Sequence, residues 1–347
     1  MWRCPECRGS LQLEDLPFRP DAIIKDDHSL WRYRAMLPVG QDAHIVTMGE
    51  GMTPLVEHAF AGRNVHFKLE YVSPTGSFKD RGTSVLVTKL REWGVINAAD
   101  DSSGNAGASL AAYCAHASIR AWIFVPAHAS SRKKSQIRIF DADLTSVEGP
   151  REQSTKELIA ELKKGDGLVY ASHAWSPFTQ EGTKTIAYEL WEQLRPRSPD
   201  CFVSPIGQGS LFLGAYRGFQ DLRDAGLISK LPRMIGVQSE ACAPIVEAVA
   251  QGLDQPASIT PGQSIAEGIA LPHPIHGREI LQAIDETNGT AIAVSDAEIR
   301  AAQSDLARIG LYVEPTSAVV GAALAKTKLE GIIVVALTGT GLKTPIP

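Results

Sequence analysis

The feature that most constrains the fold is the alternation of short apolar runs with longer amphipathic ones along the 347 residues. The apolar runs have the length and composition of strands, and the runs between them have the period of helices. Such a chain forms parallel βαβ units, with helices on both faces of a sheet. We therefore expect strands at residues 65–70, 119–126, 144–147, 168–171, 202–205, 234–238 and 331–337, and helices at residues 83–93, 110–117, 131–140, 183–194, 212–219 and 297–309.

Composition limits the classes of function. Hydrophobic residues make up 44% and charged residues 21% of the chain, which is ordinary for a globular protein. The net charge of −5 is spread without blocks of like charge, so we expect small-molecule partners and neither a nucleic-acid nor a membrane surface. No apolar run approaches the roughly 18 residues of a membrane span, and the first residues lack the apolar core of a signal peptide. We expect a cytoplasmic protein.

Two of the five cysteines, Cys4 and Cys7, have the spacing of half a zinc ribbon. A structural zinc ion needs four ligands, and the remaining cysteines are scattered at positions that suit a core. We therefore expect no metal. We interpret the pair as a remnant or an oligomer contact, and a metal role for it stays open.

A lysine stands in a tight turn between a predicted strand and a predicted helix. The run at residues 73–82 reads SPTGSFKDRG, in which Pro74 and Gly76 supply the turn. Lys79 has two interpretations. It is a solvated surface lysine, as most lysines are, or it is a buried and easily deprotonated amine that forms a Schiff base with an aldehyde cofactor.

Three further runs have the composition of ligand-binding loops. The run SSGNAGAS at residues 102–109 offers N–H and hydroxyl groups at a helix start, which suit a carboxylate or form a plain helix cap. The run PIGQGSL at residues 205–211 lets the backbone approach a phosphate, although it lacks the third glycine of a dinucleotide motif. The last strand ends at Thr338, which is either a binding residue or part of an ordinary turn.

In this order, these motifs resemble those of the fold-type II pyridoxal phosphate enzymes, and in detail the chain is similar to the threonine synthases. Further matching runs lie at residues 30–34, 49–55, 181–185 and 313–318. The resemblance implies an α/β fold like tryptophan synthase β, with two lobes and mostly parallel sheets covered by helices on both faces. It places a large lobe at residues 21–69 plus 179–347 and a small lobe at residues 70–178, after an extension at residues 1–20. It also implies pyridoxal 5'-phosphate as the cofactor and a homodimer.

The resemblance implies a role for each candidate site residue. Lys79 is the catalytic base and the residue that holds the cofactor. The other implied cofactor contacts are Asn105 at the phenolic oxygen, Thr338 at the pyridine nitrogen, and Gly207, Gln208, Gly209, Ser210 and Leu211 at the phosphate. Implied substrate contacts are Ser102, Ser103 and Ala106 at the carboxylate, and Lys133, Lys134, Thr179 and Glu267 elsewhere, although Lys133 and Lys134 also suit a solvated helix face.

The implied activity is that of a lyase acting on a β- or γ-substituted amino acid, with threonine synthase as the leading assignment. In that reaction water and O-phosphohomoserine give threonine and phosphate. This chain departs from the threonine synthases at three positions: it has Ala106 where they commonly have threonine, Ser176 where they typically have asparagine, and Thr179 where they typically have arginine. In addition, the loop around Glu267 resembles the loop of serine/threonine dehydratases more than that of the synthases. Loss of an arginine removes a bidentate phosphate contact.

The possible substrates therefore stay open. A dehydratase, an ammonia-lyase or a β-replacement synthase acting on another amino acid remains an alternative. A binding protein without catalysis is disfavoured, because the cofactor residues are all present.

Overall fold

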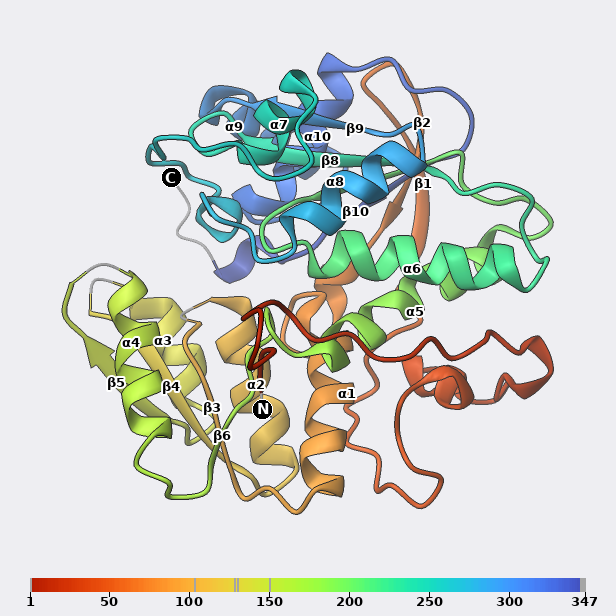
Figure 1. The fold of residues 1–347 in the computed structure, drawn as a ribbon. Helices are drawn as coiled ribbons and strands as arrows, with labels where there is room; N and C mark the ends of the chain where they lie inside the picture. Colours follow the sequence, from red (N-terminus) through yellow and green to blue (C-terminus); the bar gives the residue numbers. More distant parts are fainter. Residues whose placement is uncertain (1, 103, 128, 130, 150, 344–347) are drawn as a thin grey trace. The chain divides into compact units, whose positions relative to one another are not determined.

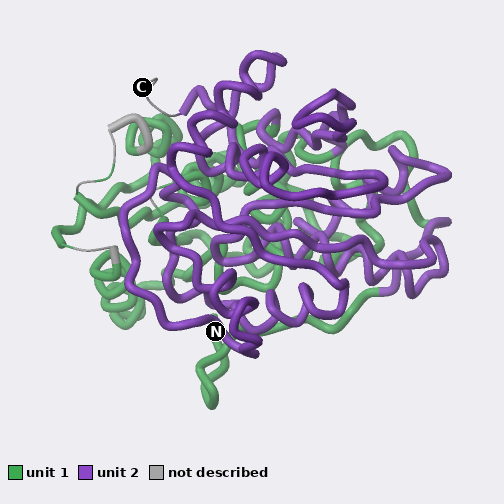
Figure 2. Tube along the Cα trace, turned by 90° about the horizontal axis from the view of Figure 1, so that it is seen from above, with its two compact units in different colours: residues 1–16, 22–51, 73–182 green, residues 17–21, 52–72, 183–347 purple. Residues whose placement is uncertain are grey.

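The computed structural model describes residues 2–102, 104–127, 129, 131–149 and 151–343. By its contacts the chain divides into two compact units (Figure 2). Unit 1 comprises Met1–Leu16, Ala22–Gly51 and Ser73–Gly182, and unit 2 comprises Pro17–Asp21, Met52–Val72 and Thr183–Pro347. Residues 22–51 thus pack with unit 1, while the lobe boundaries implied by the resemblance stay a prediction.

Unit 1 is built on a parallel sheet with the strand order β5-β4-β3-β6 (Figure 1). Because neighbouring side chains of a strand face opposite ways, Ile123 packs with α1 and α2, whereas Phe124 packs with Leu158 of α4. Helices therefore cover both faces of this sheet. Its elements are β3 (Asn97–Asp100), β4 (Arg120–Pro126), β5 (Asp143–Val147), β6 (Leu168–Tyr170), α1 (Lys79–Glu92), α2 (Asn105–His116), α3 (Ser131–Arg138), α4 (Arg151–Leu162), η2 (Leu30–Met36) and the start of α5 (Pro177–Leu194).

Unit 2 is built on a sheet with the strand order β1-β2-β10-β7-β8-β9, in which only the β1–β2 pair is antiparallel among the described strands. Val203 and Val335 pack in one core with α9 and α10, while the ring of Phe202 lies 6.0 Å from that of Phe219 in α6. The remaining bounds are β1 (Leu55–Phe60), β2 (Arg63–Lys68), β7 (Cys201–Pro205), β8 (Arg233–Ser239), β9 (Thr290–Val294), β10 (Ile333–Ala336), α6 (Ser210–Asp224), α7 (Pro244–Gln251), α8 (Gly277–Glu286), α9 (Asp296–Arg308), α10 (Pro315–Lys326), η1 (Pro20–Ala22), η3 (Glu70–Val72), η4 (Glu267–Ile269) and η5 (Gly341–Lys343).

The α/β class and the mostly parallel sheets confirm the prediction, although strands β1, β3 and β9 were not predicted. Strand β3 reads NAAD, and small or acidic residues carry little strand preference. Helices α1 and α2 begin earlier than expected, at Lys79 and Asn105, because their first turns are more polar than the apolar pattern that follows. Within the described residues no helix is both long and apolar enough to cross a membrane.

Helices α1 and α5 approach each other closely at two glycines of unit 1. A Cβ on Gly82 would lie 2.7 Å from the carbonyl oxygen of Thr179, and one on Gly182 would lie 2.1 Å from that of Arg81. Ordinary van der Waals contact begins at 3.4 Å, so neither position has room for a side chain. Helix α5 continues from Gly182 in unit 1 to Thr183 in unit 2 without a break.

Candidate active site

In each sheet, successive strands are placed on one side of a starting strand, and a later strand is placed on its other side. The point between these two strands is a topological switch point. In unit 1 the chain proceeds outward from β3 through β4 to β5 and then returns to β6 on the other side of β3. In unit 2 it proceeds from β7 through β8 to β9 and returns to β10 on the other side of β7. Ligands of open α/β sheets bind outside the carboxyl ends of the strands at such switch points. The candidate sites are therefore the ends of β3 and β6 and the ends of β7 and β10.

The lysine turn of unit 1 is held by a buried carboxylate. Asp80 is fully buried, and it accepts hydrogen bonds from the backbone N–H of Thr75 at 2.7 Å, the hydroxyl of Thr75 at 2.5 Å and the hydroxyl of Ser109 at 2.6 Å. Gly76 closes the turn with a φ of 80°, where a side chain would be strained. Because Ser109 lies on α2, Asp80 joins the first turn of α1 to α2 and fixes Lys79 relative to the loop before Asn105.

Lys79 is the first residue of α1 and is partly exposed, which contradicts the prediction of a buried amine. Its Nζ lies 4.5 Å from the centroid of the Phe78 ring. The hydroxyl of Ser77, two residues earlier, is buried and has no hydrogen-bond partner among the described residues. The turn thus presents an amine beside an unsatisfied donor, an arrangement that suits a polar ligand.

The loop after β3 carries the predicted carboxylate-binding residues. Ser102 and Ala106 are buried, Asn105 is partly exposed as the first residue of α2, and Ser103 lies outside the described residues. The hydroxyl of Ser102 accepts a hydrogen bond from the backbone N–H of Gly104 at 3.4 Å. This loop therefore folds back toward the start of α2.

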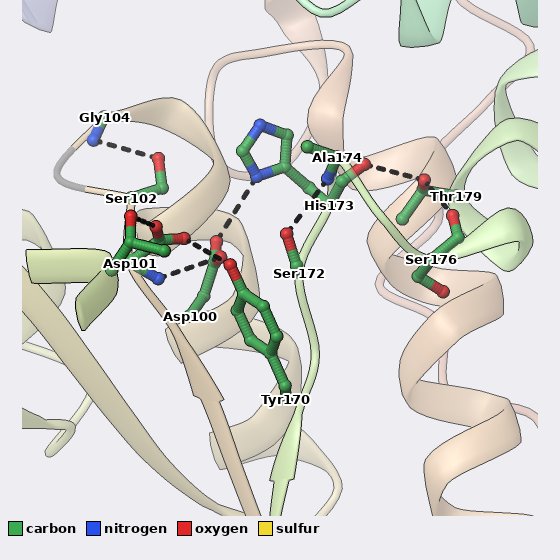
Figure 3. A network of polar contacts seen from close by, with 11 residues as sticks. Asp100, Asp101, Ser102, Gly104, Tyr170, Ser172, His173, Ala174, Ser176 and Thr179 are labelled. Atoms are coloured by element: carbon green, nitrogen blue, oxygen red, sulfur yellow. Dashed lines mark hydrogen bonds and ion pairs between the residues drawn. The ribbon is translucent and has the colours of Figure 1, made fainter. Parts of the chain in front are cut away.

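Two aspartates that were not predicted as site residues come directly before Ser102: Asp100 is the last residue of β3, and Asp101 follows it (Figure 3). Asp100 accepts from the backbone N–H of Asp101 at 2.9 Å, and its other oxygen lies 3.4 Å from Nδ1 of His173. Asp101 accepts from the hydroxyl of Tyr170 at 2.9 Å and from the hydroxyl of Thr155. Burial and the nearby aspartates raise the pKa of the Tyr170 phenol well above its usual range, so this group keeps its proton.

The predicted substrate residue Thr179 lies in the first turn of α5, directly after the loop that follows β6. Its side chain is buried, and its hydroxyl donates to the loop, where it lies 2.9 Å from the carbonyl oxygen of His173 and 2.7 Å from that of Ser176. The strand pairing of β3 with β6 brings this loop beside Asp100. A contact of Thr179 with substrate stays a prediction.

The predicted basic residues lie on α3. Nζ of Lys134 donates to the carbonyl oxygen of Ala127, in the loop after β4, at 2.6 Å. This bond ties α3 to the carboxyl end of the sheet. The side chain of Lys133 lies outside the described residues.

In unit 2 the predicted phosphate loop lies at the end of β7. Gly209 has a φ of 91°, Ser210 and Leu211 begin α6, and a Cβ on Gly207 would lie 3.0 Å from the carbonyl oxygen of Gly268. The amide oxygen of Gln208 accepts from the backbone N–H of Ile275 at 2.8 Å. The segment that follows Glu267 therefore packs directly on the glycine turn.

Thr338 lies at the end of β10, across the switch point from the glycine turn. Its backbone N–H donates to the hydroxyl of Ser317 at 2.8 Å, whereas its own hydroxyl is buried with no hydrogen-bond partner among the described residues. The hydroxyl of Thr316 accepts from the backbone N–H of Gly268 at 3.3 Å, so the start of α10 contacts both sides of this site. Glu267 is exposed at the start of η4.

The described residues contain no group of three or more His, Cys, Asp or Glu side chains that could hold a metal ion. Cys4 and Cys7 are free thiols, and the backbone N–H of Gly9 donates to the sulfur of Cys7 at 3.4 Å.

The comparison with family models decides the class of the protein. The model described as pyridoxal-phosphate dependent enzyme matches residues 46–339. The chain belongs to the pyridoxal-phosphate dependent enzymes. The "Threonine synthase" of Methanocaldococcus jannaschii is 35% identical to it, over 98% of this chain and 88% of that protein.

Solved structures with the same fold include other pyridoxal-phosphate dependent enzymes. A maize serine racemase matches with a TM-score of 0.72 at 22% identity, over 83% of this chain and 88% of that one. A threonine deaminase from T.th. matches with a TM-score of 0.72 at 23% identity, over 83% of this chain and 92% of that one. At these identities the likeness shows the fold, and together with the sequence relatives it makes this pyridoxal-phosphate dependent enzyme a lyase of fold type II.

Within each unit, taken by itself, the candidate residues fit one part of pyridoxal phosphate. The turn at Gly207 and Gly209 leads into the N-terminus of α6, where backbone N–H groups favour a phosphate. The unsatisfied hydroxyl of Thr338 suits a neutral partner for a pyridine nitrogen, because it is buried and has a hydrogen bond to give. Lys79 supplies the amine that an aldehyde requires.

Proposed function

We propose that this enzyme is a threonine synthase, which converts O-phosphohomoserine and water to threonine and phosphate. The observation that carries the proposal is the 35% identity to the Methanocaldococcus jannaschii "Threonine synthase" over 98% of the chain. The glycine turn follows β7 at the switch point of unit 2, and Asp80 ties the lysine turn to α2, the helix that follows β3 at the switch point of unit 1; both observations support catalytic use, because α/β sheets bind ligands at such points.

The proposed roles follow from the side chains. When bound, pyridoxal phosphate draws electrons from the α-carbon of the substrate and so lowers the cost of removing its proton. Lys79 holds the cofactor and takes the α-proton on Nζ. Asn105 and Thr338 orient the ring, and Gly207, Gln208, Gly209, Ser210 and Leu211 hold the phosphate. The substrate carboxylate is bound by Ser102, Ser103 and Ala106, and Lys133, Lys134, Thr179 and Glu267 lie around the rest of the substrate.

Elimination from a smaller substrate, such as serine or threonine, is the second candidate. The observation that favours it is the environment of Thr179, a position where the family has arginine. The buried hydroxyl of Thr179 donates to the backbone carbonyl oxygens of His173 and Ser176. It offers no positive charge to a phosphate. The Nζ of Lys134 likewise donates one hydrogen bond to the carbonyl oxygen of Ala127. A phosphate dianion requires several cationic donors, whereas a hydroxyl leaving group does not.

The test compares products. The protein reconstituted with pyridoxal phosphate is given O-phosphohomoserine, serine or threonine, and release of phosphate and of keto acid is measured. Phosphate release with threonine formation supports the synthase, whereas keto acid from serine or threonine without phosphate release replaces it with the dehydratase. Lys79→Ala abolishes either activity, while Lys164→Ala, which removes a surface lysine paired with Glu161, leaves it unchanged.

We also propose that the protein forms a homodimer, as the resemblance implies, and that it works in the cytoplasm. Cys4, Cys7, Cys114, Cys201 and Cys242 are all free, which suits a reducing compartment. Sedimentation equilibrium of the purified protein tests the dimer.

A further inference from the structure

An aspartate–histidine pair lies at the switch point of unit 1, and the roles proposed above leave it unused. Asp100 is 1% exposed, and Nδ1 of His173 lies 3.4 Å from its Oδ2. Its Oδ1 accepts from the backbone N–H of Asp101, so both carboxylate oxygens have a donor. The His173 side chain is 15% exposed, and Figure 3 shows its other ring nitrogen turned away from Asp100.

This arrangement determines where the histidine carries its protons. A buried carboxylate beside Nδ1 keeps a proton on that nitrogen and stabilises the imidazolium. The far nitrogen, Nε2, is then the atom that can give up a proton and take one back. In hydrolase triads an aspartate orients the catalytic histidine in the same way: it accepts from Nδ1, and Nε2 transfers the proton.

The other titratable groups that face the pair do not compete for this role. Asp101 precedes Ser102 on the loop after β3, and its carboxylate accepts from the hydroxyls of Tyr170 and Thr155. Tyr170, on β6, keeps its proton because burial and Asp101 oppose its ionisation. Of these groups, His173 is the one whose ring nitrogen can donate and accept a proton without leaving a buried charge unpaired, because Asp100 lies beside it.

The pair also lies where the substrate loops meet. Asp100 is the last residue of β3, two residues before Ser102, and His173 follows β6, the strand paired with β3 at the switch point. The carbonyl oxygen of His173 lies 2.9 Å from the hydroxyl oxygen of Thr179, which donates to it. Thr179 thus contacts the backbone of His173, while the ring of His173 contacts Asp100, which lies two residues before Ser102.

We propose that His173, oriented by Asp100, is the acid that protonates the leaving group of the substrate. This inference rests on the proposed lyase function. As the bond from the substrate carbon to the leaving group breaks, the leaving group departs with the electron pair and takes the proton from Nε2. In the synthase reaction, the water that adds to the substrate returns a proton to Nε2, so the imidazolium is regenerated. In an elimination, solvent returns it. Asp100 is a positioning residue in both cases.

The test separates leaving-group loss from α-proton removal. His173→Gln keeps a donor toward Asp100 but cannot transfer a proton, and His116→Gln, at the exposed end of α2, is the matched control. The reconstituted variants are assayed for product with the substrate that wild type turns over, so a failed synthase assignment does not affect this test. Exchange of the α-proton with D2O is followed by NMR on an amino acid that has no leaving group.

We expect His173→Gln to lower kcat by about 10²–10⁴-fold while α-proton exchange, which requires Lys79, continues at the wild-type rate. Wild-type kcat in His173→Gln overturns the proposal. Loss of α-proton exchange together with kcat also overturns it, because this result means that His173 only maintains the fold.

A second test follows the protonation of His173 in two ways, of which the NMR titration does not depend on turnover. Because an acid must be protonated, kcat falls as pH rises through the pKa of His173, and Asp100→Asn removes the charge that stabilises the imidazolium. The alkaline limb of the pH profile and the imidazole titration seen by NMR therefore both move to lower pH in Asp100→Asn. An unchanged titration of His173 in this variant overturns the proposal.

Discussion

The crossing of α1 and α5 predicts the effect of adding a single methyl group. In Gly182→Ala the new Cβ would lie 2.1 Å from the carbonyl oxygen of Arg81, which is about 1.3 Å inside the 3.4 Å of ordinary contact. The obstacle is helix backbone, so it cannot turn away as a side chain can. Relief of the clash must shift the first turn of α1, and Lys79 lies two residues before Arg81 in that turn.

The size of the shift sets the expected result. Overpacking of this kind costs about 1–3 kcal/mol of folding free energy. A displacement of a catalytic group by about 1 Å lowers a rate by about 10²-fold. We therefore expect Gly182→Ala to fold, with a slightly lower free energy of unfolding, and to lose about 10²-fold in kcat.

The assay is steady-state turnover of the reconstituted enzyme together with urea unfolding. Gly262→Ala is the control, because the nearest atom to its new Cβ lies at 3.4 Å and its backbone is unstrained. If Gly182→Ala keeps the wild-type kcat, the close approach of α1 and α5 does not position Lys79, and the reasoning is refuted.

Three further predictions concern single side chains. Asp80→Asn turns charge-assisted hydrogen bonds into neutral ones and lowers the free energy of unfolding by about 1–3 kcal/mol in urea titrations; an unchanged value refutes this interpretation. Thr338→Val removes a hydroxyl that has no hydrogen-bond partner in the part of the chain that the structure describes, so the stability of the cofactor-free protein stays the same while the cofactor Kd, measured by absorbance titration, rises about tenfold. Burial raises the pKa of Cys114 to about 12, so a thiol reagent at pH 8 labels exposed Cys7 and spares Cys114, as mass spectrometry of digests will show.

Motifs close in sequence were the predictable part of the site. The runs around Lys79, Ser102 and Gly207 carry their turn and helix-start chemistry within a few residues, so their local structure was predictable from composition, whereas their binding roles are what the resemblance implies. His173 was missed because it meets Asp100 only through the pairing of β3 with β6, across a sequence separation of 73 residues. The sequence held one signal for the pair: Asp100 is the last residue of a parallel strand, and His173 follows the neighbouring strand.

The fold was predictable where the strands are apolar and β-branched, as in β4, β7 and β10. The packing of residues 22–51 on unit 1 was not, since it depends on side chains far apart in sequence. The indole N–H of Trp31 is shared by Glu50 at 3.1 Å and by Ser84 of α1 at 2.9 Å. Local periodicity contains no information about such contacts.

The strand order of unit 2 has a consequence for how the chain is made. Strand β2 is completed at Lys68, but its parallel neighbour β10 begins only at Ile333. While the chain leaves the ribosome, the β2 edge of the β1–β2 hairpin stays unpaired until Ile333–Ala336 have been made, whereas the described strands of the unit 1 sheet are all present by Tyr170. An unpaired edge is a template for wrong pairing. The newborn chain is thus exposed to wrong pairing at the β2 edge until β10 has been made.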